Sequence, residues 1–256
     1  MGPAQSIIDV LEACQGVDSI ACSFFLPACK GGLSHSHYDV SRLQALPCTK
    51  EQHLLGMACR DGWDARSVGP SVTHLRVHLP ASSMSTMFPS PNDPIPLFHA
   101  DNEDDEAAGW DHLARLPSLT HLAIVYRPSQ RYPITTVFEH LQRLLAPPPA
   151  SEPTLAPAVP ARPVGGPALQ LILVQVVGTS LGPSPAIDEL NRLAVSSSSA
   201  ADSRSALRIV AERAPMSAAV QWEEAVREGR TVWQSAEDVV ATRLAVAASR
   251  ASHSRG

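Results

Sequence analysis

The chain has 256 residues, of which 44% are hydrophobic, 18% charged and 5% aromatic, and its formal net charge is -5. This length suits one or two domains, and the mildly acidic balance provides no basic surface for nucleic acid or anionic lipid. No apolar run is long enough to span a membrane, and the first residues lack a secretory signal pattern. We therefore expect a cytoplasmic or nuclear protein with no nucleic-acid or membrane partner.

Short apolar segments of one pattern recur along the chain. They occupy residues 17–22, 72–77, 119–124 and 169–174, with a weaker copy at 207–210. In the first four segments, positions 1, 4 and 6 are apolar. Positions 4 and 6 lie on the same side of a strand, and position 1 belongs to the turn before it. The pattern predicts a short strand in each segment.

A helix-like apolar spacing precedes each predicted strand. The spacing is strongest at 137–145 and also occurs at 7–11, 110–116 and 187–193, while the stretch at 54–57 is poorer. Strands separated by helices pair in parallel, because the chain must cross back before each new strand begins. The recurring unit therefore predicts an α/β fold with a mainly parallel sheet.

Proline-rich segments separate several of these units. The chain contains 23 prolines, and residues 79–100 and 146–167 are too rich in proline for regular structure, so we expect long, mobile loops there. Apolar residues near the end of the chain predict a C-terminal helical segment at 216–248. We expect a helix–strand repeat domain over 1–215, that helical segment, and a disordered tail at 249–256.

Several of these segments resemble a known family. Residues 16–22, 72–76 and 116–123 look like the irregular repeats of fungal (basidiomycete) F-box and leucine-rich-repeat-like proteins, and residues 222–237 are similar to the ending of mushroom-forming fungal members. The resemblance implies an irregular leucine-rich-repeat-like arc and a role in substrate recognition for ubiquitination. It covers the repeat region only, because the first repeat begins near Ser6 and leaves no room for an F-box.

One enzyme-like motif is present. Residues 178–182 read Gly-Thr-Ser-Leu-Gly directly after an apolar strand, as in serine hydrolases whose nucleophile would be Ser180. The helix that should follow at once is delayed by Pro183 and Pro185, and His253 is the only later histidine. An ordinary strand-to-helix turn explains the motif better, and the hydrolase remains the alternative function.

Other potential ligand-binding patterns fail on spacing. Histidines and cysteines gather between residues 35 and 59 without the paired spacing of zinc sites, and the acidic run at 101–106 lacks the EF-hand register. Glycine-rich phosphate loops are missing. The five cysteines are odd in number, which favours reduced thiols. We expect no metal site and no small-molecule cofactor.

His74 and His121 occupy position 3 in two successive predicted strands. In a solenoid, equivalent positions stack on neighbouring strands and line a recognition face, so both are candidate binding residues. The alternative is a tolerated, exposed Thr–His pair.

The sequence thus favours a non-enzymatic protein-interaction scaffold with an unidentified protein partner. Besides the Ser180 hydrolase, an incomplete gene product without independent function is the remaining alternative.

Overall fold

The computed structural model of the chain describes residues 18–22, 50–54, 68–69, 71–78, 116, 118–128, 133–145, 169–178, 182–196, 205–215, 217, 220–221, 227 and 231–253. They fall into two compact units: the described residues up to Leu119 belong to the first unit, and those from Thr120 onward belong to the second. Among these residues, the first unit contributes three strands, and the second contributes three strands and three helices.

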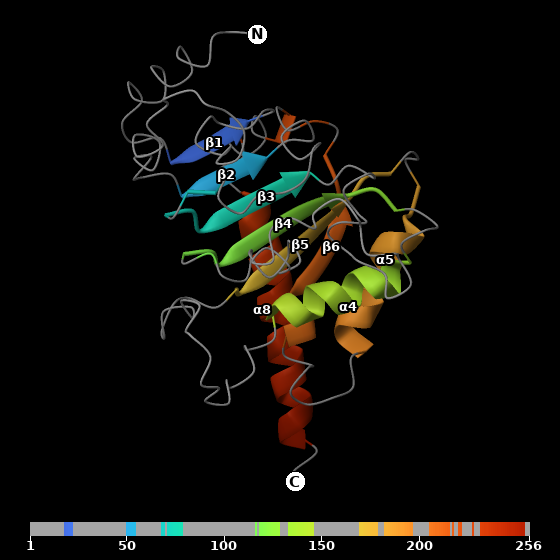
Figure 1. Ribbon diagram of the computed structural model, residues 1–256. Helices are drawn as coiled ribbons and strands as arrows, with labels where there is room; N and C mark the ends of the chain where they lie inside the picture. The colour runs from blue at the N-terminus through green and yellow to red at the C-terminus, as the bar shows by residue number, and fades with distance from the viewer. Residues whose placement is uncertain are drawn as a thin grey trace, which may run out of the picture. The chain divides into compact units, whose positions relative to one another are not determined.

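The first unit is a parallel arrangement of β1 (Ser19–Cys22), β2 (Glu51–Leu54) and β3 (His74–His78), with β2 in the centre. Figure 1 shows the three strands side by side and pointing the same way. Ile20, Gln52 and Leu75 lie in register across them. Because side chains alternate along a strand, these three residues lie on one face, and their neighbours in sequence lie on the other.

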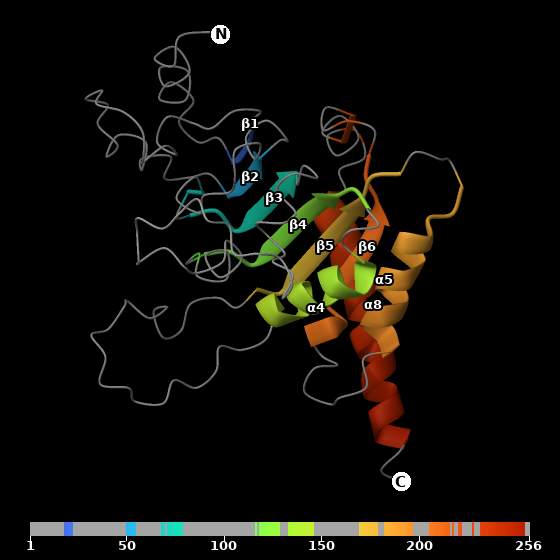
Figure 2. The same ribbon diagram turned by 45° about the vertical axis from the view of Figure 1, so that its right-hand side comes forward.

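The second unit has a helical layer on each side of a parallel sheet. The strands are β4 (His121–Tyr126), β5 (Leu171–Val176) and β6 (Ile209–Arg213), and the helices are α4 (Ile134–Leu145), α5 (Pro185–Ser196) and α8 (Val232–His253). β5 pairs with β4 on one side and with β6 on the other. In both views, α4 and α5 cover one face of these strands, and α8 crosses the opposite face (Figures 1 and 2).

The helices α4 and α5 form where the sequence spacing predicts them. α4 buries five apolar residues on one stripe, which are Val137, Phe138, Leu141, Leu144 and Leu145. α5 begins with Pro185, whose fixed φ suits the first helical position. Asp188 in its first turn interacts favourably with the helix dipole.

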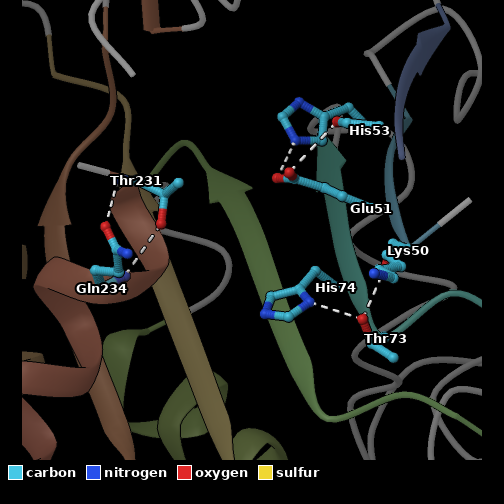
Figure 3. Close-up of polar contacts among 8 residues, drawn as sticks. Lys50, Glu51, His53, Thr73, His74, Thr231 and Gln234 are labelled. Carbon is cyan, nitrogen blue, oxygen red and sulfur yellow. Dashed lines mark hydrogen bonds and ion pairs between the residues drawn. The ribbon is translucent and has the colours of Figure 1, made fainter. Parts of the chain in front are cut away.

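The helix α8 begins with a reciprocal cap. The amide of Gln234 donates to Oγ1 of Thr231, and the amide of Thr231 donates to Oε1 of Gln234 (Figure 3). Beyond the cap, Trp233, Ala236 and Val240 pack into one cluster with strand residues of β4, β5 and β6. Four strand residues complete that cluster, namely Ala123, Leu171, Leu173 and Val210.

The predicted repeat pattern is confirmed for β3, β4 and β5. In each, the residues at positions 4 and 6 lie on one face, as do Leu122 and Ile124 in β4. Position 1 precedes the strand and is buried, as are Val72, Leu119 and Leu169. A mixed α/β fold with parallel strand pairing is therefore confirmed. The leucine-rich-repeat-like arc stays a prediction, and the proline-rich segments 79–100 and 146–167 lie outside the described residues.

Two expectations from the sequence are wrong. Leu54 is not in a helical stretch at 54–57 but ends the strand β2, which the apolar pattern did not reveal because Glu51, Gln52 and His53 are all polar. The helix at the C-terminus is longer than expected, since α8 runs through His253 into the segment predicted as a disordered tail. The expected helix at 7–11 falls outside the described residues, as does the helix expected at 110–116 except for Leu116, which is not in a helix.

None of the described helices combines the length and the apolar character that crossing a bilayer requires.

Candidate functional site

The two candidate histidines repeat one local hydrogen bond. Oγ1 of Thr73 lies 2.8 Å from Nδ1 of His74, and Oγ1 of Thr120 lies 2.8 Å from Nδ1 of His121. Each histidine is the first residue of its strand. The repeated Thr-His dipeptide therefore forms the same contact in both units.

The two pairs differ in their other contacts. The hydroxyl of Thr73 lies 3.2 Å from the carbonyl of Lys50 and 2.8 Å from Nδ1 of His74, so its single proton can be donated to either group (Figure 3). At His121, Nε2 lies 3.0 Å from Oε1 of Glu237. A carboxylate can only accept, so the neutral imidazole of His121 carries its proton on Nε2 and accepts from Thr120.

Six side chains share one face of the first unit, which we call the polar face: Ser19, Glu51, His53, His74, Arg76 and His78. Ser19, Glu51 and His74 lie in register across the three strands, and His53 and Arg76 follow two residues later in β2 and β3. Oγ of Ser19 donates to Oε2 of Glu51, at 3.3 Å. Nε2 of His53 donates to Oε1 of the same carboxylate, at 2.7 Å (Figure 3).

The carboxyl-terminal part of the polar face is buried. The exposed fraction of Arg76 is 1% and that of His53 is 3%. Burial, followed by the nearby charges of Arg76 and His53, lowers the pKa of His78 to about 4. His78 is therefore neutral at pH 7, and the face offers hydrogen-bonding groups rather than a concentrated positive charge.

The accessible groups lie at the amino ends of the strands. The side chains of Asp18 and Lys50 are 75% and 71% exposed, and Oδ1 of Asp18 lies 3.9 Å from Nζ of Lys50. Thr73 and His74 beside them are half-buried. The more exposed groups of this part of the first unit therefore lie along one edge, which we call the amino-end edge: Asp18, Ser19, Lys50, Glu51, Thr73 and His74.

His121 is enclosed in the second unit. Its exposed fraction is 7%, and its ring meets that of Trp233 edge-on, with centroids 5.8 Å apart and an interplanar angle of 77°. Burial lowers the pKa of its imidazole. The expectation that His121 lies on an exposed strand face is wrong, because α8 covers that face. Its assignment as a binding residue gains no support from this placement.

The residues that would form a hydrolase are described only in part. Ser180 lies outside the described residues, while Gly178 and Gly182 on either side of it are exposed. The helix α5 begins at Pro185, which agrees with the delayed start expected from the two prolines. His253 lies in the last turn of α8, where its Nδ1 donates to the carbonyl of Ser249, at 2.8 Å.

Within the part of the chain that the structure describes, no group of three histidine, cysteine or acidic side chains is arranged to hold a metal ion. Of the histidines and cysteines between residues 35 and 59, only His53 is described, and its Nε2 bonds to Glu51. His35, His37, Cys48 and Cys59 lie outside the described residues, as does the acidic run at 101–106.

Sequence reasoning missed most of the polar face. Glu51 and His53 belong to strand β2, which has no apolar pattern, and Arg76 occupies position 5 of its repeat, which the apolar positions 1, 4 and 6 do not define. Polar residues at alternating positions of aligned strands were the available signal. Glu237 and Trp233, spaced four residues apart on α8, could be linked to His121 only through the fold.

No protein-family model matches the chain, and no curated protein or solved structure is detectably similar to it.

Proposed function

We propose that the chain is a non-enzymatic protein-interaction scaffold that binds a protein partner at the amino-end edge of its first unit. The observation that carries the proposal is the register of Ser19, Glu51 and His74 across three parallel strands. Register-matched side chains form a continuous surface in repeat proteins, and a partner can contact one residue from each strand.

The chemistry of this edge suits a polar contact. Asp18 and Lys50 supply opposite charges, and Thr73 and His74 supply a hydroxyl and an imidazole held in place by hydrogen bonds. Side chains that are already oriented lose less conformational freedom when a partner binds. A polar rim of mixed charge therefore favours specificity and moderate affinity over tight apolar association.

A narrower form of the proposal follows from the resemblance to fungal F-box and leucine-rich-repeat-like proteins. The partner would then be a substrate presented for ubiquitination. Support for this form rests on the quoted segments at 16–22, 72–76 and 116–123 alone.

The test is affinity capture of the tagged chain from a fungal lysate, followed by mass spectrometry, for wild type and matched variants. His74→Ala and Lys50→Glu alter the amino-end edge, whereas Arg192→Ala alters an exposed residue of α5. We expect one partner to be captured by wild type and by Arg192→Ala, and its recovery to fall about tenfold with either edge variant. Equal capture by all variants would place the contact elsewhere and contradict the proposal.

The hydrolase alternative is tested in the same preparation. A fluorophosphonate probe labels a serine only when that serine is activated as a nucleophile. We expect no labelling. Labelling that Ser180→Ala abolishes would replace the scaffold by a serine hydrolase.

In the affinity capture, enrichment of cullin-ligase adaptor subunits would support the ubiquitination form of the proposal. Recovery of chaperones alone would contradict the scaffold.

A further inference from the structure

The strand β6 has one paired edge and one outer edge within the described part of the second unit. The amide of Ile172 donates to the carbonyl of Arg208, and the amide of Ala214 donates to the carbonyl of Val176, so these backbone groups face β5. Backbone direction alternates along a strand. Ile209 and Ala211 therefore direct their amides and carbonyls away from β5.

Asn191 of α5 binds this outer edge as a neighbouring strand would. Its Nδ2 donates to the carbonyl of Ala211, at 2.8 Å, and its Oδ1 accepts from the amide of Ala211, at 3.0 Å. One carboxamide thus occupies both backbone groups that another strand would need at this position. An extended segment cannot pair with Ala211 while Asn191 remains in place.

Arg243 of α8 extends the same contact from the opposite face of the sheet. Its Nη1 donates to the carbonyl of Ile209, at 2.7 Å, and its Nη2 donates to Oδ1 of Asn191, at 2.7 Å. The arginine therefore occupies the next outward carbonyl and also orients the amide of Asn191. α5 and α8 meet at the edge of β6 through this pair of side chains, which we call the edge clamp.

Edge strands with unoccupied backbone groups recruit further strands, and natural proteins block them. We propose that the edge clamp of Asn191 and Arg243 prevents β6 from adding a strand of a second copy of this chain. Two copies of β6 related by a twofold axis would offer each other identical edges, so each exposed donor would find a matching acceptor. The clamp therefore keeps the chain from associating through β6.

This role is separate from the binding proposed for the first unit. Arg243 lies three residues after Val240, which packs under the sheet with Trp233. Undocking of α8 would withdraw Arg243 from Ile209 and remove the hydrogen bond that it donates to Asn191. Docking of α8 therefore completes the closure of the β6 edge that Asn191 begins.

The experiment compares clamp variants with matched controls by sedimentation velocity over a range of concentrations. Asn191→Ala and Arg243→Ala open the edge. Arg243→Lys keeps the positive charge but cannot bond the carbonyl of Ile209 and Oδ1 of Asn191 in the geometry of the guanidinium. The controls are Arg192→Ala and Arg250→Ala, which change exposed arginines on the same two helices. We expect the clamp variants to associate at concentrations roughly tenfold lower than wild type or the controls.

Hydrogen exchange of the amide of Ala211 identifies the surface involved. In Asn191→Ala this amide should exchange at least about tenfold faster than in wild type at low concentration, because its acceptor is gone. At high concentration the strand of a second copy should protect it again. Adding Ala211→Pro removes the donor from an edge position where proline is tolerated, and should abolish the association.

Three results would overturn the proposal. One is folded clamp variants that sediment like the controls at every concentration. Another is association that persists with Ala211→Pro, which would locate it on a different surface. The third is loss of the far-ultraviolet circular dichroism signal in Asn191→Ala and in both Arg243 variants, because the clamp would then be a condition of folding rather than a block on association.

Discussion

Nε2 of His121, in the first position of β4, lies 3.0 Å from Oε1 of Glu237 on the helix α8. The equivalent histidine of the preceding repeat, His74, is half-buried at the amino-end edge of the first unit. The Thr-His dipeptide is the same in both places, and so is the threonine contact. The helix α8 therefore buries His121, whereas His74 is only half-buried.

The hydrogen bond between the neutral imidazole of His121 and Glu237 should add little to stability. The side chain of Glu237 is 50% exposed, so water competes for its carboxylate. We expect Glu237→Ala to lower the free energy of unfolding by ~0.5–1 kcal/mol in urea denaturation, because His121 also loses the acceptor of its buried Nε2 proton. Asp238→Ala, an exposed neighbour on α8, should change it by less than ~0.5 kcal/mol. Equal effects of the two variants would contradict the role given to Glu237.

Trp233 should contribute most of the free energy by which α8 docks on the sheet. It is buried in the cluster with Ala236 and Val240. We expect Trp233→Ala to lower the free energy of unfolding by ~3–5 kcal/mol, because it removes a large ring and leaves a cavity. Val246→Ala, at an exposed position of the same helix, should cost less than ~0.5 kcal/mol. A loss below ~1 kcal/mol for Trp233→Ala would show that α8 is not anchored through this side chain.

Stability should decline below neutral pH because of His78. Its pKa is about 4 in the folded chain, against an ordinary value of 6.5, as burial and then Arg76 and His53 disfavour the charged form. The unfolded chain binds a proton below pH 6.5 that the folded chain does not bind until about pH 4. The free energy of unfolding therefore falls as pH drops through this interval, by up to ~1.4 kcal/mol per pH unit for one proton.

The measurement is urea denaturation of wild type and His78→Gln at several pH values between 7.5 and 4. The difference between the two proteins isolates His78 from the carboxylates. We expect the slope of the variant to be shallower. Buried His121, whose pKa is also lowered, should leave a residual slope of the same sign. Parallel pH profiles would contradict the assignment to His78.

A buried glutamine in β5 provides a double-mutant test. Gln175 is 0% exposed, and its Nε2 donates to Oε1 of Glu212, at 2.7 Å. We expect Glu212→Ala to lower the free energy of unfolding by ~1–3 kcal/mol, because a buried amide loses its acceptor. In Gln175→Leu an apolar side chain needs no acceptor, so adding Glu212→Ala to it should cost less than in wild type. Additive losses would show that the two side chains are not coupled.

Local patterns predicted much of the second unit. The apolar positions of 119–124 and 169–174 placed β4 and β5, and the spacing at 137–145 placed most of α4. Both signals report how one element meets a buried layer, and a single segment carries them. β2 had no such signal, since three of its four residues are polar. Its strand conformation depends on pairing with β1 and β3.

The candidate site was predictable only in its local part. His74 and His121 could be named because the repeat places them at one position, and the threonine beside each is adjacent in sequence. The contacts of His53 with Glu51, of His121 with Glu237 and of Asn191 with Ala211 join different elements or alternate positions of one strand. Their residue types alone did not identify them.

The sequence by itself determined the strand and helix periods where an apolar pattern is present, and the parallel pairing that follows from their alternation. These depend on residues that are neighbours in the chain. Only the tertiary structure decided that His121 is buried, that its Nε2 bonds to Glu237, and that Arg243 and Asn191 occupy the edge of β6. Burial and hydrogen-bond partners are set by segments far apart in the chain, which meet only when the chain folds.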